Sequence, residues 1–234
     1  MSSYKRVLIK LSGEALSGTK GYGFDYDIVN SVVKQLKTVV EQGTELAIVI
    51  GGGNFWRGRT DNKMDRTKSD QIGMLATVMN SLYVAEVCRA NGLNAVVQTP
   101  FQIGTITELF SKDSALEHMK NKTVVFFAGG TGHPYFSTDT GAALRGCEIE
   151  ADVLLFAKNI DGVYDSDPKF NPNAKKFTEL TGKDIIEKQL KVIDTAAASL
   201  CMDQHLDILI FPLNFENSII DVISGKNIGT IIKN

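Results

Sequence analysis

The sequence predicts an α/β fold, a three-layer αβα sandwich in which helices cover both faces of a central, mostly parallel sheet. Short apolar, β-rich runs alternate with amphipathic helical segments along the whole chain, which is typical of strand–helix–strand units. Three of the strand-like runs, at residues 7–11, 46–50 and 123–128, lead directly into glycine or Ser-Gly loops. Ligands in folds of this class bind at the carboxyl ends of the strands, so these loops are candidate ligand sites.

The first strand–helix–strand unit lies at the start of the chain. Residues 7–11 form a mostly apolar run typical of a buried parallel strand. In the helix that follows, apolar residues recur at three- and four-residue steps, with Asp25 or Asp27 as the N-cap and Gly43 as the stop. The strand at 46–50 follows, which completes the unit.

The same alternation continues to the end of the chain. A long helix is expected over about 69–90, ended by Asn91 and Gly92. Further strands are expected over 95–97, 123–128, 153–157, 208–211 and 230–232, and further helices over 114–119, after 139, and over 184–190, 194–205 and 219–223. No linker, low-complexity segment or repeat divides the pattern, so we expect a single domain over residues 1–234.

Composition excludes several classes of function. With 43% hydrophobic and 22% charged residues, the chain can bury a substantial core. Lys plus Arg total 25 against 27 Asp plus Glu, without a long block of either sign, which argues against binding to nucleic acid or to an acidic membrane. No apolar run approaches the ~20 residues of a membrane span, and the start of the chain does not resemble a signal peptide.

The cysteine pattern indicates a reducing compartment. Cys88, Cys147 and Cys201 form an odd, widely spaced set without C-x-x-C or Cys/His spacing. That arrangement argues against disulfides and structural zinc. We therefore expect a cytoplasmic protein whose cysteines are small buried hydrophobic residues.

The loop after the first strand, Lys10-Leu11-Ser12-Gly13, suits a polyphosphate. Small residues let backbone N–H groups approach phosphate oxygens, and the lysine adds a positive charge. In isolation the tetrapeptide is more typical of a strand end and a turn. The glycine spacing from Gly13 to Lys20 imitates a Walker A loop, but the ending Thr-Lys is reversed and no helix opens at the lysine, so we reject a P-loop.

The second glycine loop, Gly51-Gly52-Gly53-Asn54, follows a buried strand and precedes Arg57 and Arg59. Three glycines let consecutive peptide units approach a ligand closely. A flexible turn is the alternative, but the arginines favour a phosphate site because their forked donors match phosphate oxygens.

The third loop runs from Gly129 to Asp139 and combines glycines, hydroxyls and a carboxylate just before a helix. Thr131, Ser137 and Thr138 are candidate donors to a phosphate or nucleobase, helped by the helix N-terminus. Asp139 is equally compatible with catalysis and with capping the helix.

After the strand at 153–157, the segment from Lys158 to Pro168 is an acidic turn that contains Tyr164 and is suited to holding a nucleoside. Asp194 has the spacing of an N-cap, which outweighs a role as a metal ligand. His118 and His205 have no partners at ligand spacing, so we assign them no function.

Several segments, in order over almost the whole chain, carry a family resemblance. They are Lys10-Leu11-Ser12-Gly13-Glu14-Ala15-Leu16, Val49-Ile50-Gly51-Gly52-Gly53-Asn54, Arg57-Gly58, Gly73-Met74-Leu75-Ala76-Thr77-Val78-Met79-Asn80, the loop Thr131 to Asp139, Leu144-Arg145-Gly146, Glu148-Ile149-Glu150-Ala151-Asp152-Val153 and Asp161-Gly162-Val163-Tyr164. Together they resemble the bacterial uridylate kinases of the amino-acid kinase family. The resemblance implies the amino-acid-kinase fold and transfer of the γ-phosphoryl group of Mg·ATP to UMP.

The same resemblance implies roles for individual residues. Those implied for ATP are Lys10, Leu11, Ser12, Gly13, Gly53, Arg57, Lys158, Asn159, Tyr164 and Asp167. Those implied for UMP are Gly52, Asp70, Thr131, Gly132, His133, Pro134, Tyr135, Phe136, Ser137 and Thr138. Gly18, Thr19, Lys20, Gly21, Tyr22 and Gly23 correspond to the family's effector region. The sequence departs from the family pattern at His133, where asparagine is expected, and at Ala157-Lys158-Asn159, where an Ala-Thr pair is more usual.

The resemblance also implies regulation by GTP and UTP, a hexamer built as a trimer of dimers with Met74 and Met79 in the dimer contact, and a first part that binds mainly UMP. The part after about residue 150 would bind mainly ATP, whose phosphates carry the Mg²⁺, so no metal-ligating residues are expected. The catalytic residues would be Lys10, Arg57 and Asp139, which supply and orient positive charge between two anions. A carboxylate or carbamate kinase on the same fold and a nucleotide sensor without enzymatic activity are the alternatives.

Overall fold

The computed structural model describes residues 4–56, 64–190, 192–213 and 216–234. The strands of its central sheet are β1 (Arg6–Leu11), β2 (Glu45–Ile50), β3 (Ala95–Thr99), β4 (Glu108–Leu109), β5 (Val124–Phe127), β6 (Val153–Lys158), β9 (Glu179–Thr181), β10 (Ile208–Pro212) and β11 (Thr230–Lys233). Among the described residues these form one nine-stranded sheet in the order β4-β3-β5-β2-β1-β6-β10-β11-β9. Two short strands, β7 (Val163–Tyr164) and β8 (Lys176–Phe177), form a separate ribbon.

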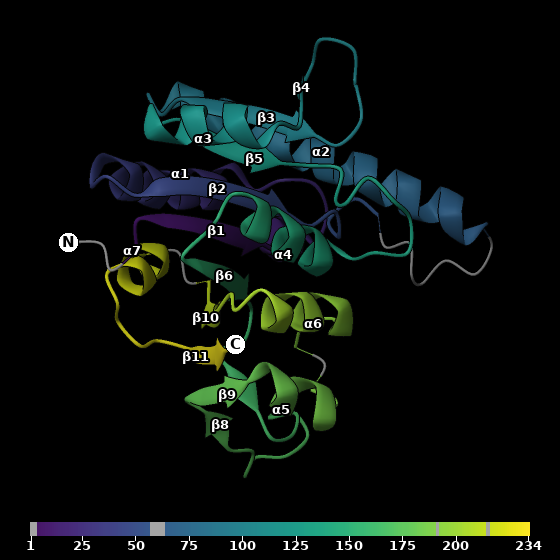
Figure 1. Ribbon diagram of the computed structural model, residues 1–234, viewed down its shortest axis with the longest axis vertical. Helices are drawn as coiled ribbons and strands as arrows, with labels where there is room; N and C mark the ends of the chain where they lie inside the picture. The colour runs from purple at the N-terminus through teal and green to yellow at the C-terminus, as the bar shows by residue number, and fades with distance from the viewer. Residues whose placement is uncertain (1–3, 57–63, 191, 214–215) are drawn as a thin grey trace.

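Helices cover both faces of the sheet. They are η1 (Glu14–Lys20), α1 (Tyr26–Glu41), α2 (Arg66–Ala90), α3 (Lys112–Lys120), α4 (Thr138–Glu148), α5 (Gly182–Glu187), α6 (Thr195–Asp203) and α7 (Ser218–Ile223). In Figure 1, α3, α4 and α6 lie in front of the sheet and α1 and α2 lie behind it. The predicted αβα sandwich is confirmed.

The sheet is mostly parallel, as predicted. β1 lies at its centre and pairs in parallel with both β2 and β6. The exception is β11, which pairs antiparallel with β10 and in parallel with β9, so the last two strands at this edge run against the others. The hydrophobic pattern does not reveal this reversal, because strand direction leaves no mark on the alternation of side chains.

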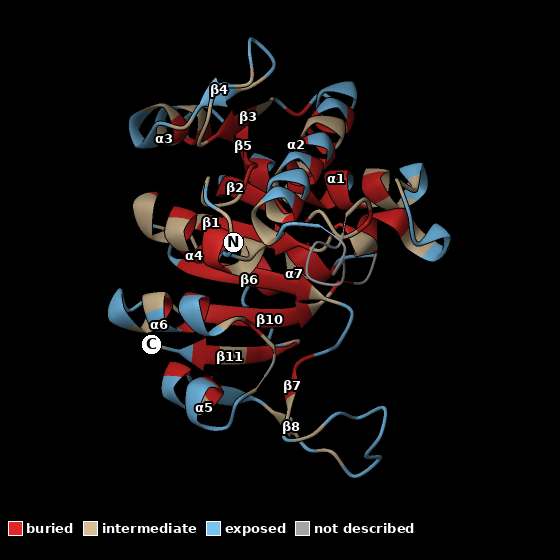
Figure 2. Ribbon diagram, turned by 90° about the vertical axis from the view of Figure 1, so that its right-hand side faces the viewer, coloured by how far each residue is buried: buried red, intermediate tan, exposed pale blue. Residues whose placement is uncertain are grey.

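The strands bury alternate residues against two different helical layers. Val7, Ile9 and Leu11 of β1 pack in one core with residues of α1, α2 and α7. Leu8 packs in a second core with residues of α3, α4, α5 and α6. Figure 2 shows that the strands at the centre of the sheet are buried along most of their length. Because side chains alternate across a strand, Lys10 lies on the same face as Leu8, under α4.

The helices start within a few residues of the predicted positions, but the N-cap of α4 is a different residue from the one proposed. Asp25 caps α1, as one of the two predicted candidates. The N-cap of α4 is Ser137, whose hydroxyl accepts hydrogen bonds from the backbone N–H groups of Asp139 and Thr140. The interpretation of Asp139 as a cap is therefore wrong. Its carboxylate is left available for other contacts.

The predicted irregular segment after the first strand is partly helical. Residues Glu14–Lys20 form a 3₁₀ helix, η1, with a kink at Gly18. Lys20 lies at the end of this helix and does not open one, which agrees with the rejection of a P-loop. The buried side chains of Ala15 and Leu16 anchor η1, a short apolar signal that the polar residues around it conceal.

No helix in the described ranges is long and apolar enough to cross a membrane. The three cysteines are free. Cys88 and Cys201 are buried, and burial raises the pKa of each thiol to about 12. Cys147 is only partly buried, against the expectation for it.

Candidate active site

The glycine loops meet at one edge of the sheet. Because β2 and β5 are parallel neighbours, the turns that begin at Gly51 and Gly129 leave the sheet side by side. Gly129 has a φ of 79°, and its N–H donates to Thr77 Oγ1 on α2 at 2.8 Å. A Cβ atom on Gly51 would lie 3.6 Å from Thr138 Oγ1 at the start of α4. A Cβ atom on Gly141, in the first turn of α4, would lie 3.3 Å from Gly130 Cα, so both turns border the N-terminus of α4.

A buried cluster of charges lies at this edge, under the start of α4. Asp139 Oδ1 is 2.9 Å from Lys10 Nζ of β1, and its Oδ2 is 3.6 Å from Lys158 Nζ at the end of β6. Only 10%, 13% and 22% of the side chains of Lys10, Asp139 and Lys158 are exposed, respectively. One carboxylate thus holds two ammonium groups that come from neighbouring strands.

The electrostatics of this cluster favour the charged carboxylate. Burial opposes ionisation of Asp139, but Lys10 and Lys158 outweigh it, so the pKa of Asp139 lies below its ordinary value. Burial lowers the pKa of Lys158, and the ammonium of Lys10 adds to that effect, while Asp139 and then Asp194 oppose it. Asp139 is therefore ionised at neutral pH, and Lys158 holds its proton less firmly than an exposed lysine.

Asp194 connects the starts of two helices. Its carboxylate caps α6 by accepting from the N–H of Ala197 at 2.8 Å. The hydroxyl of Ser137 also donates to it, and the hydroxyl of Thr140 lies 2.9 and 3.0 Å from its two oxygens. The predicted N-cap role of Asp194 is confirmed. The same carboxylate fixes the N-terminus of α4 beside that of α6.

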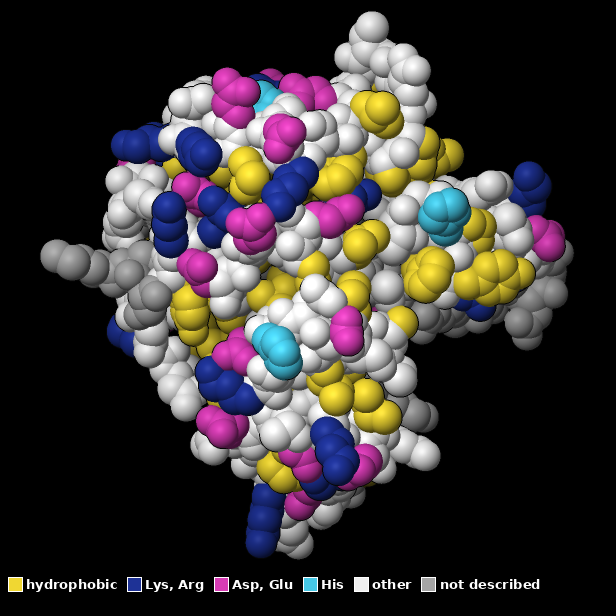
Figure 3. All heavy atoms as spheres, in the orientation of Figure 1, with side chains coloured by type: hydrophobic (Ala, Val, Ile, Leu, Met, Phe, Trp, Pro, Cys, Tyr) yellow, Lys and Arg dark blue, Asp and Glu magenta, His cyan; other side chains and the backbone are white. Residues whose placement is uncertain are grey.

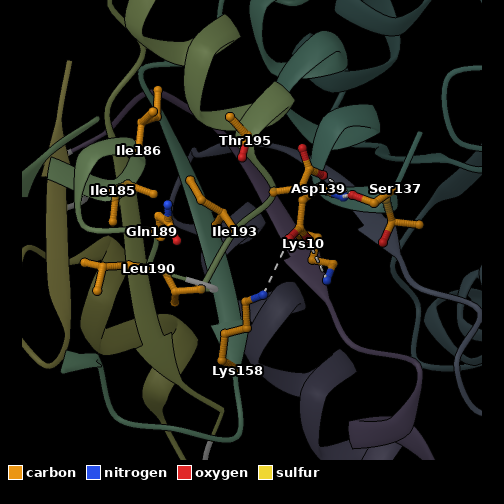
Figure 4. A pocket seen from close by; sticks show the side chains of 13 residues that line it. Lys10, Ser137, Asp139, Lys158, Ile185, Ile186, Gln189, Leu190, Ile193 and Thr195 are labelled. Carbon is orange, nitrogen blue, oxygen red and sulfur yellow. Dashed lines mark hydrogen bonds and ion pairs between the residues drawn. The ribbon is translucent and has the colours of Figure 1, made fainter. Parts of the chain in front are cut away.

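The charged cluster forms one wall of a pocket of about 590 Å³. Its other wall comes from the segment around α5 and the start of α6 (Figure 4). The residues that line it are Lys10, Ser137, Thr138, Asp139, Lys158, Ile185, Ile186, Gln189, Leu190, Val192, Ile193, Asp194 and Thr195. We call this the larger pocket. It combines a charged floor with an apolar side, as nucleotide sites commonly do.

A second, smaller pocket of about 140 Å³ lies on the other side of the start of α4. It is lined by Gly52, Trp56, Ser69, Asp70, Gly73, Met74, Thr77, Gly130, Thr131, His133, Phe136, Ser137 and Thr138. Ser137 and Thr138 line both pockets. The two pockets therefore meet at the N-terminus of α4, where partial positive charge favours anions.

Asp70 makes several hydrogen bonds in the wall of the smaller pocket. Its carboxylate accepts from Arg66 Nε at 2.8 and 2.9 Å and from the backbone N–H of Tyr135 at 2.8 Å. Trp56 Nε1 donates to Ser69 Oγ at 3.1 Å on the same helix, α2. The bond from Tyr135 joins the start of α2 to the third glycine loop, and the bond from Trp56 joins it to the segment after the second.

A pair of buried amides holds the Gly51 turn in place. Asn54 and Asn80 exchange hydrogen bonds of 3.0 and 2.7 Å, and Asn80 Nδ2 donates to the carbonyl of Gly51 at 2.6 Å. A Cβ atom on Gly13 would lie 2.3 Å from the same carbonyl oxygen, so glycine is required where the first and second loops touch. Asn54 Nδ2 also donates to the carbonyl of Gly23, which attaches the predicted effector segment to this turn.

The residues predicted for UMP mostly converge. Gly52, Asp70, Thr131, His133, Phe136, Ser137 and Thr138 line the smaller pocket. Gly132, Pro134 and Tyr135 belong to the same loop but are not among the described residues that line it. The hydroxyl of Ser137, predicted to donate to a ligand, is used in the cap of α4 and in the bond to Asp194.

The residues predicted for ATP are more dispersed. Lys10 and Lys158 line the larger pocket, whereas Leu11 is buried in the core. Within the described chain, Ser12, Gly13, Gly53, Asn159, Tyr164 and Asp167 are not among its lining residues. The hydroxyl of Tyr164 donates to Asp161 at 2.7 Å. Arg57 and Arg59 lie outside the described residues, so their predicted roles stay predictions.

Sequence reasoning missed the apolar wall made by residues 185–190 and 192–195. Their hydrophobic residues are typical of helices packed on a sheet, and the helices predicted there are present. The local sequence pattern does not indicate that the connection between α5 and α6 faces the ends of β1 and β6. That contact depends on the packing of the whole sheet. In the parts of the chain that the structure describes, no group of three His, Cys, Asp or Glu side chains could hold a metal ion.

A sequence model of the amino acid kinase family matches residues 5–212 of the chain. The structure is similar to UMP kinase from Bacillus anthracis, with 35% identity, a TM-score of 0.92, and coverage of 98% of this chain and 96% of that one. UMP kinase from Ureaplasma parvum matches with 34% identity, a TM-score of 0.93, and coverage of 98% and 99%. Uridylate kinase from Archaeoglobus fulgidus matches with 26% identity, a TM-score of 0.73, and coverage of 99% and 100%.

Proposed function

The chain belongs to the amino acid kinase family, and from this premise we propose that it is a UMP kinase, transferring the γ-phosphoryl group of Mg·ATP to UMP. The observation that carries the proposal is the pair of pockets that meet at the start of α4, beside Lys10 and Asp139. Two anionic substrates that react end to end require such an arrangement. The similarity to two UMP kinases at about a third identity over nearly the full chains supports the choice of UMP.

The larger pocket is the proposed ATP site and the smaller one the proposed UMP site. A volume of about 590 Å³ lies within the range of about 300–1,000 Å³ typical of ligand pockets. The smaller pocket, at about 140 Å³, would enclose only part of UMP, with the rest against the 131–136 loop. Asp70 would meet the ribose hydroxyls. Asn159, Tyr164 and Asp167 are the proposed adenosine contacts, and residues 1–234 are proposed to form one domain.

The chemical step needs alignment and positive charge. An oxygen of the UMP phosphate forms a bond to the γ-phosphorus of ATP, the bond from that phosphorus to the β–γ bridging oxygen breaks, and the electron pair stays on ADP. The second pKa of a phosphate monoester is about 6, so the acceptor oxygen is already deprotonated at neutral pH. No general base is required. The obstacle is repulsion between two anions, which fixed cations and backbone N–H groups overcome.

Lys10 is the proposed source of positive charge at the transferring phosphoryl group, together with Arg57. Asp139 orients Lys10 through the 2.9 Å ion pair. Both oxygens of Asp139 face lysines, and those of Asp194 accept hydrogen bonds from two hydroxyls and a backbone N–H. Neither carboxylate is free to bind a metal directly, so the phosphates of ATP would hold Mg²⁺, which neutralises part of their charge.

We also propose a regulated homo-oligomer, a hexamer of three dimers, that acts in the cytoplasm in pyrimidine nucleotide biosynthesis. GTP and UTP are the proposed effectors, with residues 18–23 as the effector segment. Support for association comes from α2, where Ile72, Leu75 and Met79 share one exposed stripe at helical spacing. In Figure 3, hydrophobic side chains also gather on the projecting right-hand part of the molecule, where Figure 1 places the loop that leads into α4 as well as the start of α2.

A coupled assay for ADP release tests the function. The purified protein is given Mg·ATP and, in turn, UMP, CMP, AMP and aspartate, and the nucleotide product is identified by chromatography. We expect ADP release with UMP and an equal amount of UDP. Release with aspartate would instead indicate a carboxylate kinase. Nucleotide binding without release for any acceptor would indicate a sensor, and either result rejects the proposal.

A further inference from the structure

Lys158 lies where the end of β6 meets the charged floor of the larger pocket. The register pairs Lys10 of β1 with Phe156 of β6, so Lys158 is two residues further toward the carboxyl end of the neighbouring strand. Leu154 and Phe156 pack in the core shared with α4 and α6. Since side chains two residues apart share a face, Lys158 points to the same side of the sheet as Lys10.

The geometry places the two ammonium groups on opposite oxygens of one carboxylate. Lys10 Nζ lies 2.9 Å from Asp139 Oδ1, and Lys158 Nζ lies 3.6 Å from Asp139 Oδ2. Figure 4 shows Lys158 approaching Asp139 from the opposite side to Ser137, along the wall of the pocket. Asp139 thus separates two cations that would otherwise repel each other.

The charges around Lys158 are not balanced within the protein. The groups that face it are Lys10 from β1, Asp139 from α4 and Asp194 at the start of α6. The charge of Asp194 is compensated by the N-terminus of α6, a backbone N–H and two hydroxyls. Two partly buried ammonium groups then share Asp139. Such a site is short of negative charge, and an anionic ligand in the pocket would relieve the shortage.

We propose that Lys158 is a second cationic contact to the polyphosphate chain of ATP, acting beside Lys10 across Asp139, rather than a contact to adenosine. The inference rests on the proposed function and assigns a more specific role to one residue of that site. During transfer, negative charge accumulates on the β–γ bridging oxygen as its bond to the γ-phosphorus breaks. Lys158, which lines the larger pocket at the carboxyl end of β6, is placed to stabilise that charge beside Lys10.

Binding of ATP compared with adenosine discriminates between the two roles. Lys158→Met keeps the length and the apolar stem of the side chain but removes the ammonium group. We expect calorimetry to show that this variant binds ATP about tenfold more weakly or worse, since a hydrogen bond to a charged group contributes about 1.5–3 kcal/mol. Adenosine binding should change less than about twofold. Lys226→Met, which removes an exposed lysine paired with Asp221, should leave both affinities unchanged.

Turnover supplies the second readout. In Lys158→Met, kcat with saturating ATP and UMP should fall by about 10²-fold, the size of effect typical of losing one group that stabilises transition-state charge. Lys158→Arg retains the charge and should recover at least part of the loss. Lys158→Gln, a polar variant of similar length, repeats the test should the methionine variant fold poorly by circular dichroism.

Two results would overturn the inference. Equal weakening of ATP and adenosine binding would make Lys158 a nucleoside contact. Unchanged ATP affinity together with unchanged kcat in either neutral variant would remove it from the site. The proposed function is judged separately, from ADP release by the unmodified protein with UMP. If the unmodified protein releases none while the methionine variant still loses affinity for ATP alone, the function fails and the phosphate contact stands.

Discussion

Lys10 is a cation placed where water cannot solvate it well. It lies at the carboxyl end of a fully paired central strand, is only 8% exposed, and has a carboxylate 2.9 Å away. Burying a charge is costly unless it is paired, and Asp139 meets that condition while leaving the ammonium group at the wall of the pocket. The ion pair positions the ammonium group before a substrate arrives, and such preorganisation is what stabilisation of a transition state requires.

At the residue scale, Lys10→Ala should separate binding from catalysis. UMP affinity should stay near that of the unmodified protein, because the smaller pocket does not include Lys10. Turnover should fall by about 10²- to 10³-fold, as expected for removal of one well-placed cation. Steady-state kinetics with calorimetry of UMP measures both quantities. Lys112→Ala, which removes an exposed lysine paired with Glu150, is the control, and turnover like that of the control would exclude Lys10 from the mechanism.

The lowered pKa of Lys158 leads to a prediction for how turnover falls at alkaline pH. Burial lowers its pKa, helped by Lys10 and opposed by Asp139 and Asp194, so the ammonium loses its proton at a lower pH than an ordinary lysine of pKa 10.5. Turnover should therefore decline as the pH rises toward that lowered pKa, while Asp139 stays ionised throughout. In Lys158→Arg the decline should move to higher pH, since arginine does not titrate in this range. A profile of kcat up to about pH 10 in both proteins tests the shift.

At the scale of elements, the site depends on two helices that begin side by side. Asp194 caps α6 and accepts from the hydroxyls of Ser137 and Thr140 in the first turn of α4. Without these bonds the start of α4 would be held by its packing on the sheet and by the ion pairs of Asp139 alone. Stability and catalysis should therefore be lost together when the contact is removed.

Asp194→Ala tests this link. Loss of the cap costs about 1 kcal/mol, and the hydroxyls left without their acceptor add about 1–3 kcal/mol. Asp25→Ala is the matched control, because Asp25 caps α1 but bonds only to backbone N–H groups of its own helix. Urea unfolding should show a greater loss of stability for Asp194→Ala, and the assay should show lost turnover in that variant alone. Equal losses of stability in the two variants would mean that the contact between helices contributes nothing.

The glycine loops show how much of an element can be read locally. Gly13 and Gly51 are visible in the sequence as a strand-end signal, and both lie at the predicted edge of the sheet. Their need for glycine comes from each other, because a Cβ atom on Gly13 would meet the carbonyl of Gly51. The amide pair of Asn54 and Asn80 that holds this turn joins residues 26 positions apart. That pairing follows from how α2 packs and leaves no pattern in the sequence.

At the scale of the whole molecule, the exposed stripe on α2 suggests a subunit contact. Leu75 and Met79 are about half exposed, at 51% and 49%, on a helix whose opposite side is buried. Neighbouring apolar side chains that are exposed to water favour association with another surface. None of Ile72, Leu75 and Met79 lines either pocket, so assembly can be perturbed without changing a residue that lines the site.

Leu75→Glu should reduce the size of the assembly without unfolding the subunit. Burying a carboxylate in an apolar contact is unfavourable unless it is paired, whereas an exposed position on a helix tolerates it. Light scattering measures the mass, and circular dichroism checks the fold. Lys120→Glu, which places the same charge on an exposed position of α3, should keep the mass of the unmodified protein. An unchanged mass for Leu75→Glu would exclude this stripe as an interface.

The sequence by itself determined the sandwich class, the order of the main strands and helices, the N-caps of α1 and α6, and the loops at the strand ends. Those features are encoded by local signals, namely the period of the hydrophobic residues, capping side chains and glycines. Only the tertiary structure decided that Lys10 and Lys158 share Asp139 and that Ser137 caps α4. It also decided that the connection between α5 and α6 forms the apolar wall of the larger pocket. These contacts join segments distant in the chain, and they exist because strand register and helix packing bring those segments to one edge of the sheet.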